Sequence, residues 1–170
     1  MSENLRGLER YFASHQLPYD ARRIAAAVAS PDVRAVFAHL RGPNAPTAAA
    51  YGRALEVQRR AYQAAHARCF AEHRLDALVF PTTPLPAAGI GEDDLVTLCG
   101  QSVSTFDAFT RNANLASVIG VPGISLPMGV NESGLPLGIE IDAPAGMDRR
   151  LLSMALGIEA VCSPMPPPSF

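Results

Sequence analysis

Three short apolar runs constrain the fold of this chain most, because each has the length and content of a buried β-strand. They lie at 76–80, 123–127 and 137–141, and residues typical of turns flank them. Such runs are expected of strands that are covered on both faces. Three strands are too few to make a complete sheet of this kind, so they predict part of a larger α/β sheet with helices on both sides.

Turn residues suggest how these strands are connected. Asn131-Glu132-Ser133-Gly134 separates the second run from the third and predicts that the two pair antiparallel. A smaller hairpin is predicted for 95–98 and 101–103, around Cys99-Gly100. An amphipathic helix opening at 146–148 closes the fold, and the Pro-rich end at 164–170 is expected to be extended.

The first 74 residues are predicted to be mostly helical. Apolar spacing and capping residues predict helices over 3–14, from the cap Asp20 to Val28, from Ser30-Pro31 to Leu40, and from Pro46-Thr47 to about His73. The apolar face of the last helix is expected to carry Leu55, Tyr62, Ala65 and Cys69. A further helix is predicted from the cap Thr105 to about Val118. We therefore expect one partial domain: 1–74 mostly helical, 75–163 the sheet-forming core with its closing helix, and 164–170 a Pro-rich tail.

Composition excludes several classes of function. A hydrophobic content of 48%, a charged content of 18% and a net charge of −2 describe a globular protein with no electrostatic argument for nucleic acid or an anionic membrane. The N-terminus has no apolar segment of a signal peptide, and no apolar run approaches the ~20 residues that span a bilayer. Cys69, Cys99 and Cys162 are odd in number and far apart, which favours reduced thiols and a cytoplasmic location.

No complete catalytic set is visible. Gly123-x-Ser125 resembles the start of a nucleophile elbow, but Pro127 stands where the second Gly belongs, so Ser125 is better interpreted as a strand or pocket residue. The four histidines lack metal-ligand spacing, and there is no phosphate loop or dinucleotide fingerprint, so we expect no metal and no cofactor. The chain also contains no lysine, which excludes a lysine base within it.

A polar cluster before a Gly-rich turn is the best candidate site. Asp107, Thr110 and Arg111 share one helix face by their spacing, and Asn112 follows them. The cluster stands just before Gly120-Val121-Pro122-Gly123, a turn that could bring backbone close to a ligand. Helix capping and local ion pairing explain the cluster about equally well.

At this point the chain resembles the C-terminal part of the amidase signature family. The resemblance rests on Leu75-Asp76-Ala77-Leu78-Val79-Phe80-Pro81-Thr82-Thr83-Pro84, on Gly120-x-Pro122-Gly123-x-Ser125-Leu126-Pro127-x-Gly129, and on Gly134-Leu135-Pro136-Leu137-Gly138-Ile139-Glu140 with the helix from Asp148. The spacing from Phe109-x-Arg111-Asn112 to Gly120 looks most like the mandelamide and indoleacetamide hydrolase branch. Ser117 departs from the Asn that is usual three residues before the turn Gly.

The resemblance implies a Ser–cis-Ser–Lys triad and an α/β/α mixed-sheet domain. The triad lies in the N-terminal half of the family's domain, so no catalytic residue carries over to this chain. In the amidotransferase A subunit an acid before Phe-Thr recognises the substrate's amino group, and Asp107 is similarly placed. The substrate-binding residues that we expect are Asp107, Phe109, Thr110, Arg111, Asn112, Thr82, Ile124 and Ser125.

Three hypotheses remain open. The chain is the C-terminal portion of an amidase that contributes pocket wall without a triad, with an aryl-acetamide-like amide as the substrate once an N-terminal half completes it. The second hypothesis is a non-catalytic module that self-associates as a homo-oligomer through its sheet edge. The third is one half of a two-chain amidase. We expect neither nucleic acid nor membrane as a partner.

Overall fold

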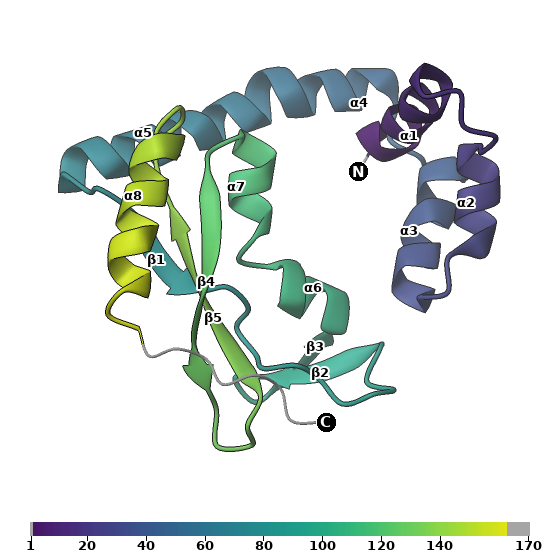
Figure 1. Ribbon diagram of the computed structural model, residues 1–170. Coiled ribbons are helices and arrows are strands. Elements are labelled where there is room, and N and C mark those ends of the chain that lie inside the picture. Colours follow the sequence, from purple (N-terminus) through teal and green to yellow (C-terminus); the bar gives the residue numbers. More distant parts are fainter. Residues whose placement is uncertain (1, 163–170) are drawn as a thin grey trace. The chain divides into compact units, whose positions relative to one another are not determined.

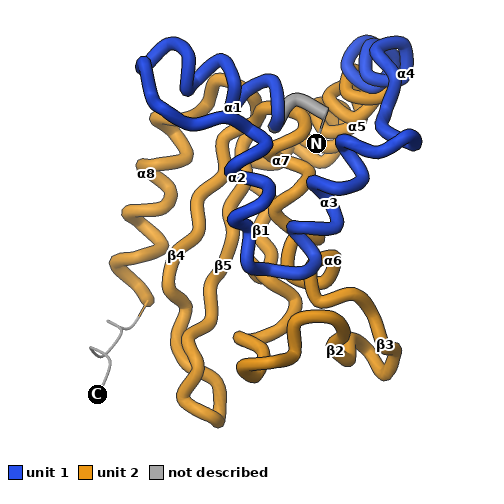
Figure 2. Tube along the Cα trace, turned by 90° about the vertical axis from the view of Figure 1, so that its right-hand side faces the viewer, with its two compact units in different colours: residues 1–57 blue, residues 58–170 orange. Residues whose placement is uncertain are grey.

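The computed structural model describes residues 2–162, and the chain divides into two compact units, 1–57 and 58–170 (Figure 2). The boundary between these units lies within the predicted long helix. The predicted Pro-rich tail lies outside the described residues. Among the described helices, none has the length and the hydropathy needed to cross a membrane.

The first unit consists of helices at the predicted positions. They are α1 (Ser2–Ser14), α2 (Ala21–Ala27), α3 (Pro31–Arg41) and α4 (Ala48–Arg53). Asp20 caps α2 by accepting a hydrogen bond from the backbone N–H of Arg23 at 2.6 Å, and Thr47 caps α4. These caps satisfy donors that the first helical turn leaves free, so the predicted starts of both helices are confirmed.

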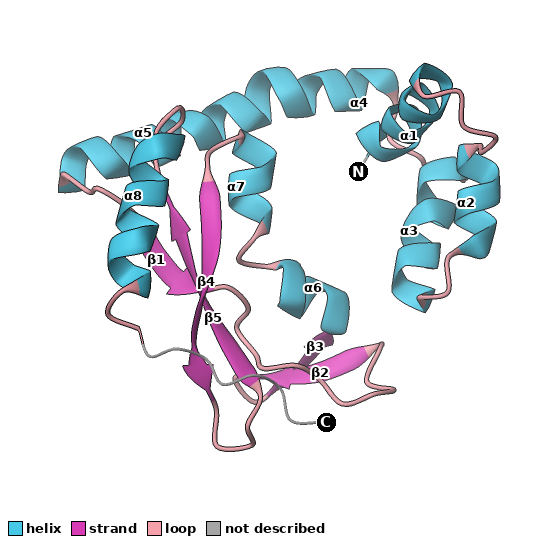
Figure 3. Ribbon diagram, in the orientation of Figure 1, coloured by secondary structure: helices cyan, strands magenta, loops and turns pink. Residues whose placement is uncertain are grey.

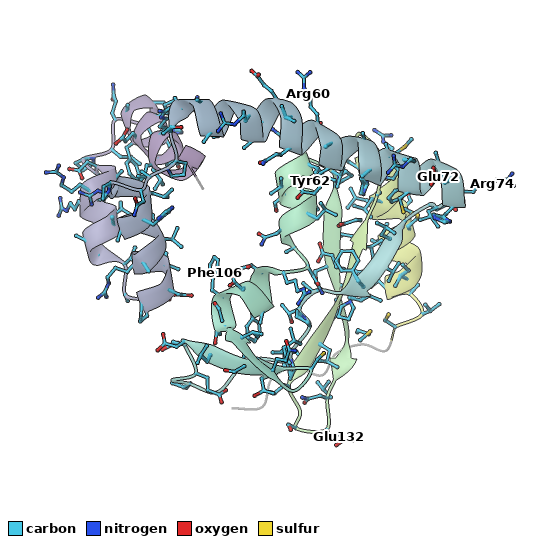
Figure 4. The ribbon with its side chains drawn as sticks, turned by 180° about the vertical axis from the view of Figure 1, so that it is seen from behind. Arg60, Tyr62, Glu72, Arg74, Phe106 and Glu132 are labelled. Carbon is cyan, nitrogen blue, oxygen red and sulfur yellow. The ribbon has the colours of Figure 1, made fainter. Side chains whose placement is uncertain are left out.

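The long helix is interrupted and presents a different face from the one predicted. A π-helical segment (Ala54–Gln58) separates α4 from α5 (Arg59–His73). Tyr62 is 56% exposed, whereas His66 and Phe70 are buried, so the predicted apolar face is wrong for α5. The wider π turn changes the phase of the residues after it. Arg60 and Arg74 point away from this helix in Figure 4.

A three-stranded antiparallel sheet forms the centre of the second unit. Its order is β1 (Leu78–Pro81), β5 (Pro136–Asp142) and β4 (Gly123–Val130), so β5 is central (Figure 3). The predicted antiparallel pairing of β4 with β5 is confirmed. A separate hairpin joins β2 (Leu95–Leu98) to β3 (Gln101–Ser104), and Cys99 and Gly100 both have positive φ at its turn, as the predicted two-residue loop requires.

The helix predicted from Thr105 to Val118 is instead two short helices, α6 (Thr105–Thr110) and α7 (Asn114–Ile119). The cap is also one residue earlier than predicted: Ser104 Oγ accepts from the N–H of Asp107 at 3.3 Å. Asn112 lies between the two helices, and its side chain bonds a backbone carbonyl of another segment. Asn side chains that find such partners compete with helix formation.

One face of the sheet is apolar and covered by α8 (Asp148–Glu159). Leu126, Ile141 and Ala143 pack there against Leu151 and Ala155 of α8, and all five are buried. Figure 1 shows α8 and α7 on opposite sides of this sheet. The prediction of strands apolar on both faces is wrong for the α7 side, because alternate residues of β4 and β5 there are polar.

Candidate functional site

The loop after β1 is tied to the segment after α6. Asn112 Nδ2 donates to the carbonyl oxygen of Pro81 at 2.7 Å. Thr82, the next residue, has its hydroxyl 2.5 Å from that of Ser125 on β4. The structure therefore brings Asn112, Thr82 and Ser125, three of the predicted site residues, to one end of β1.

Asp107 and Arg111 line a cavity of about 420 Å³ beside the hairpin. The other lining residues are Leu98, Val103, Ser104 and Ala108. Both charged residues are exposed, and no ion pair joins them among the described residues. Apolar walls combined with two charged groups suit the binding of a small polar ligand.

The other residues of α6 have separate surroundings. Phe109 lines a different cavity of about 250 Å³, together with Glu92, Val96 and residues of the 85–88 loop. Thr110 donates its hydroxyl to the carbonyl oxygen of Phe106 at 2.8 Å, so its proton serves the helix. Phe106, half-buried, is labelled on α6 in Figure 4.

Ile124 is not brought together with the other predicted site residues. Its side chain packs against the buried cluster under α8, on the opposite face of the sheet from Ser125. Side chains alternate between the faces of a strand, so adjacent residues of β4 cannot both line one pocket on one face.

Four polar side chains gather on the sheet face away from α8: Thr82, Ser125, Glu140 and Asp142, which we call the acid–hydroxyl cluster. Thr82 donates to Glu140 and lies 2.5 Å from Ser125. Burial raises the pKa of Glu140, the Asp142 charge raises that pKa further, and the Thr82 bond partly offsets both. Burial also raises the pKa of Asp142, which is only 2% exposed.

Two glycines make room for this cluster. A Cβ at Gly123 would lie 2.5 Å from Asp142 Oδ1 and 3.0 Å from Glu140 Oε1. A Cβ at Gly138 would lie 2.8 Å from the Thr82 hydroxyl oxygen and 3.0 Å from that of Ser125. A side chain at either position would therefore force these polar side chains to move.

Sequence reasoning did not place Glu140 and Asp142 in a candidate site. The signal was present, since two acids stand two residues apart in an otherwise apolar strand and must share one face. Glu140 lies directly opposite Ser125 in the strand pairing, but among the described residues the Ser125 hydroxyl contacts the Thr82 hydroxyl and bonds no carboxylate. Within residues 2–162, no three His, Cys, Asp or Glu side chains gather as a metal site would require.

Comparison with known proteins agrees with this architecture. The sequence profile of the Amidase family matches residues 11–152, most of the chain. The chain belongs to the amidase family. It is 42% identical over 133 residues to an indoleacetamide hydrolase of Agrobacterium vitis, covering 78% of this chain and 28% of that protein. It is 35% identical over 175 residues to a mandelamide hydrolase of Pseudomonas putida, covering 95% of this chain and 33% of that protein.

Solved amidase structures share the fold. A crystal structure of an amidase superposes with a TM-score of 0.71 at 26% identity, covering 95% of this chain and 33% of that one. The native peptide amidase of Stenotrophomonas maltophilia gives 0.70 at 27% identity, covering 99% and 33%. The chain therefore spans about a third of these amidases, and the α/β fold expected for the C-terminal part of such a domain is confirmed.

Proposed function

We propose that this chain supplies a substrate-binding wall of an amidase that hydrolyses an amide C–N bond, and that it does not hydrolyse amides by itself. The hydrogen bond from Asn112 to Pro81 carries the proposal, because it joins two segments expected to bind substrate and holds the Thr82 loop next to Ser125. Family membership supports the reaction class. The lack of any lysine in the chain supports its inactivity alone.

An aryl-acetamide is the substrate class that we propose. Two relatives bear the names indoleacetamide hydrolase and mandelamide hydrolase, and both names describe an amide next to an aromatic group. Phe109 on one cavity and the apolar walls around Asp107 on another would suit an aromatic ring. Ile124 leaves the set, because it packs under α8. The proposed substrate-binding residues are therefore Asp107, Phe109, Thr110, Arg111, Asn112, Thr82 and Ser125.

The test is ammonia release from mandelamide and from indoleacetamide. The purified chain alone is expected to release none above background. Mixing it with the part of the P. putida mandelamide hydrolase that lies outside the match is expected to restore turnover. Turnover by the chain alone would contradict the proposal, and a mixture that associates without turnover would contradict the role in catalysis.

Self-association is the second candidate, and the edge of the sheet favours it. β4 pairs only with β5 among the described strands, and Met128 and Val130 on it are 47% and 48% exposed. A free strand edge with apolar side chains is a template for pairing with another chain. Sedimentation would separate the candidates: a homodimer that is indifferent to an amidase partner favours this one. The three free cysteines support a cytoplasmic location for either.

A further inference from the structure

The acid–hydroxyl cluster has more hydrogen-bond acceptors than donors. The Thr82 hydroxyl proton is donated to Glu140, so the short contact between Thr82 and Ser125 uses the Ser125 proton. Both hydroxyl protons of the cluster are then occupied. Asp142 Oδ1 is buried and has no hydrogen-bond partner among the described residues.

No basic side chain of the described residues neutralises the two acids. Among residues 2–162, the ion pairs join Arg68 to Glu72 and Arg150 to Asp76. Arg59 comes near the turn that precedes β4, where its guanidinium would lie 3.0 Å from a Cβ at Gly120, but it forms no ion pair with Asp142. A buried carboxylate without a donor is strongly unfavourable, and natural proteins pair such groups.

The position of Asp142 suggests where its partner comes from. Asp142 lies on the central strand, between Leu78 of β1 and Gly123 of β4, on the face away from α8. Its Oδ1 and Glu140 Oε1 both point over Gly123, which has no side chain and is itself exposed. A group approaching over Gly123 would therefore meet Glu140, which is partly exposed, and would reach the covered Asp142 Oδ1 once the side chains around it move.

We propose that the acid–hydroxyl cluster binds a positively charged side chain, a lysine or an arginine, carried by the remaining two-thirds of an amidase domain. The inference rests on the proposed function, because it assumes that such a partner completes this chain. Charge complementarity selects a basic side chain over a neutral donor, since two adjacent carboxylates converge on one point. A cation held by Asp142 and Glu140 would satisfy the orphan oxygen and remove the repulsion between the two acids.

The chain alone gives the first test. In the absence of its partner, the Asp142 charge opposes folding, so Asp142→Asn should raise the urea midpoint of the full chain at pH 7. Glu140→Gln should raise the midpoint by less, because Glu140 already accepts a bond from Thr82. Glu132→Gln, which neutralises an exposed acid at the hairpin tip (Figure 4), is the matched control and should leave it unchanged. A lower midpoint for both cluster variants would overturn the proposal.

Association gives the second test. The probe is the part of the P. putida mandelamide hydrolase outside the match, titrated into each variant by calorimetry. Asp142→Asn should weaken binding about thirtyfold or more, since breaking a buried charge pair has a large cost. Glu140→Gln should also weaken it, while Glu132→Gln should bind as the wild type does. Equal affinity for wild type and both cluster variants would overturn the inference.

The two proposals fail in different ways. If the mixture hydrolyses amides equally well with wild type and with Asp142→Asn, the proposed function stands and the proposal that a basic side chain binds the cluster fails. If wild type neither binds the probe nor yields turnover, the proposed function fails, and a midpoint raised by Asp142→Asn but not by Glu132→Gln still supports an unpaired buried carboxylate. Millimolar MgCl₂ or CaCl₂ could instead raise the urea midpoint of the wild type and not that of Asp142→Asn. That result would assign the cluster to a metal ion and overturn the proposal of a basic side chain.

Discussion

Gly123→Ala is the substitution whose effect follows most directly from the structure. The new Cβ would lie 2.5 Å from Asp142 Oδ1 and 3.0 Å from Glu140 Oε1. Cβ atoms in real proteins essentially never approach another heavy atom this closely, so the Asp142 carboxylate must move. Asp142 is 2% exposed and on the central strand, which leaves its side chain little room.

The cost is that of overpacking around the buried Asp142 carboxylate. Forcing an extra carbon into a well-packed region costs about 1–3 kcal/mol of unfolding free energy. Backbone strain adds nothing here, since Gly123 does not have the positive φ that penalises other residues. We therefore expect Gly123→Ala to lower the unfolding free energy by about 2 kcal/mol in urea melts at pH 7.

A matched glycine and a second substitution make the prediction sharp. Gly157 lies in α8 with nothing within 4 Å of its would-be Cβ, so Gly157→Ala should stabilise the chain by about 0.5–1 kcal/mol through helix propensity. In an Asp142→Ala background the 2.5 Å contact is gone and the 3.0 Å approach to Glu140 Oε1 remains, so the cost of Gly123→Ala should fall by more than half. An unchanged cost in that background, or no cost at all, would refute the steric reasoning.

The remaining predictions concern the pH dependence and two polar contacts. Burial lowers the pKa of His66, so as the pH falls the unfolded state takes up a proton before the folded state does. The contribution of His66 to the unfolding free energy is therefore complete above about pH 6.5 and is lost below it. His66→Gln should flatten the change in urea midpoint between pH 7.5 and 5.5 relative to wild type. Asn112→Ala removes the bond to Pro81 and should cost about 1 kcal/mol in the same melts. Arg150→Gln breaks an ion pair with Asp76 whose side chains are 59% and 67% exposed, so its cost should stay below about 1 kcal/mol, and a larger loss would mean that the pair is stronger than exposed pairs usually are.

Local signals in the sequence predicted most of the elements. Asp20, Thr47 and the Cys99-Gly100 turn each act through their own backbone, so their effect can be judged without knowing the rest of the fold. Thr105 was expected to cap a long helix, but Ser104 does so and Thr105 Oγ1 donates to the carbonyl of Glu92 instead. Such long-range partners cannot be identified from spacing alone.

The same limit explains what was missed in the candidate site. Thr82 and Ser125 were both expected near substrate, but their direct contact depends on strand register, which joins residues 43 positions apart. His66, one of the four histidines without metal-ligand spacing, is buried and packs on Phe70 with ring centroids 4.7 Å apart. Its burial follows from packing of α5 against α7, which an Ala-rich helix does not reveal.

The unsatisfied polar atoms of the second unit are not spread evenly. Among the described residues, the buried side-chain atoms without a hydrogen-bond partner are Arg59 Nε, His66 Nε2 and Asp142 Oδ1. α5, which carries the first two, packs on α7, and Asp142 faces away from α8. The α8 side, in contrast, is a closed apolar core around Ile141, which is fully buried. Since native proteins rarely leave buried polar groups without partners, the proposed amidase partner is expected to contact the side of the sheet away from α8.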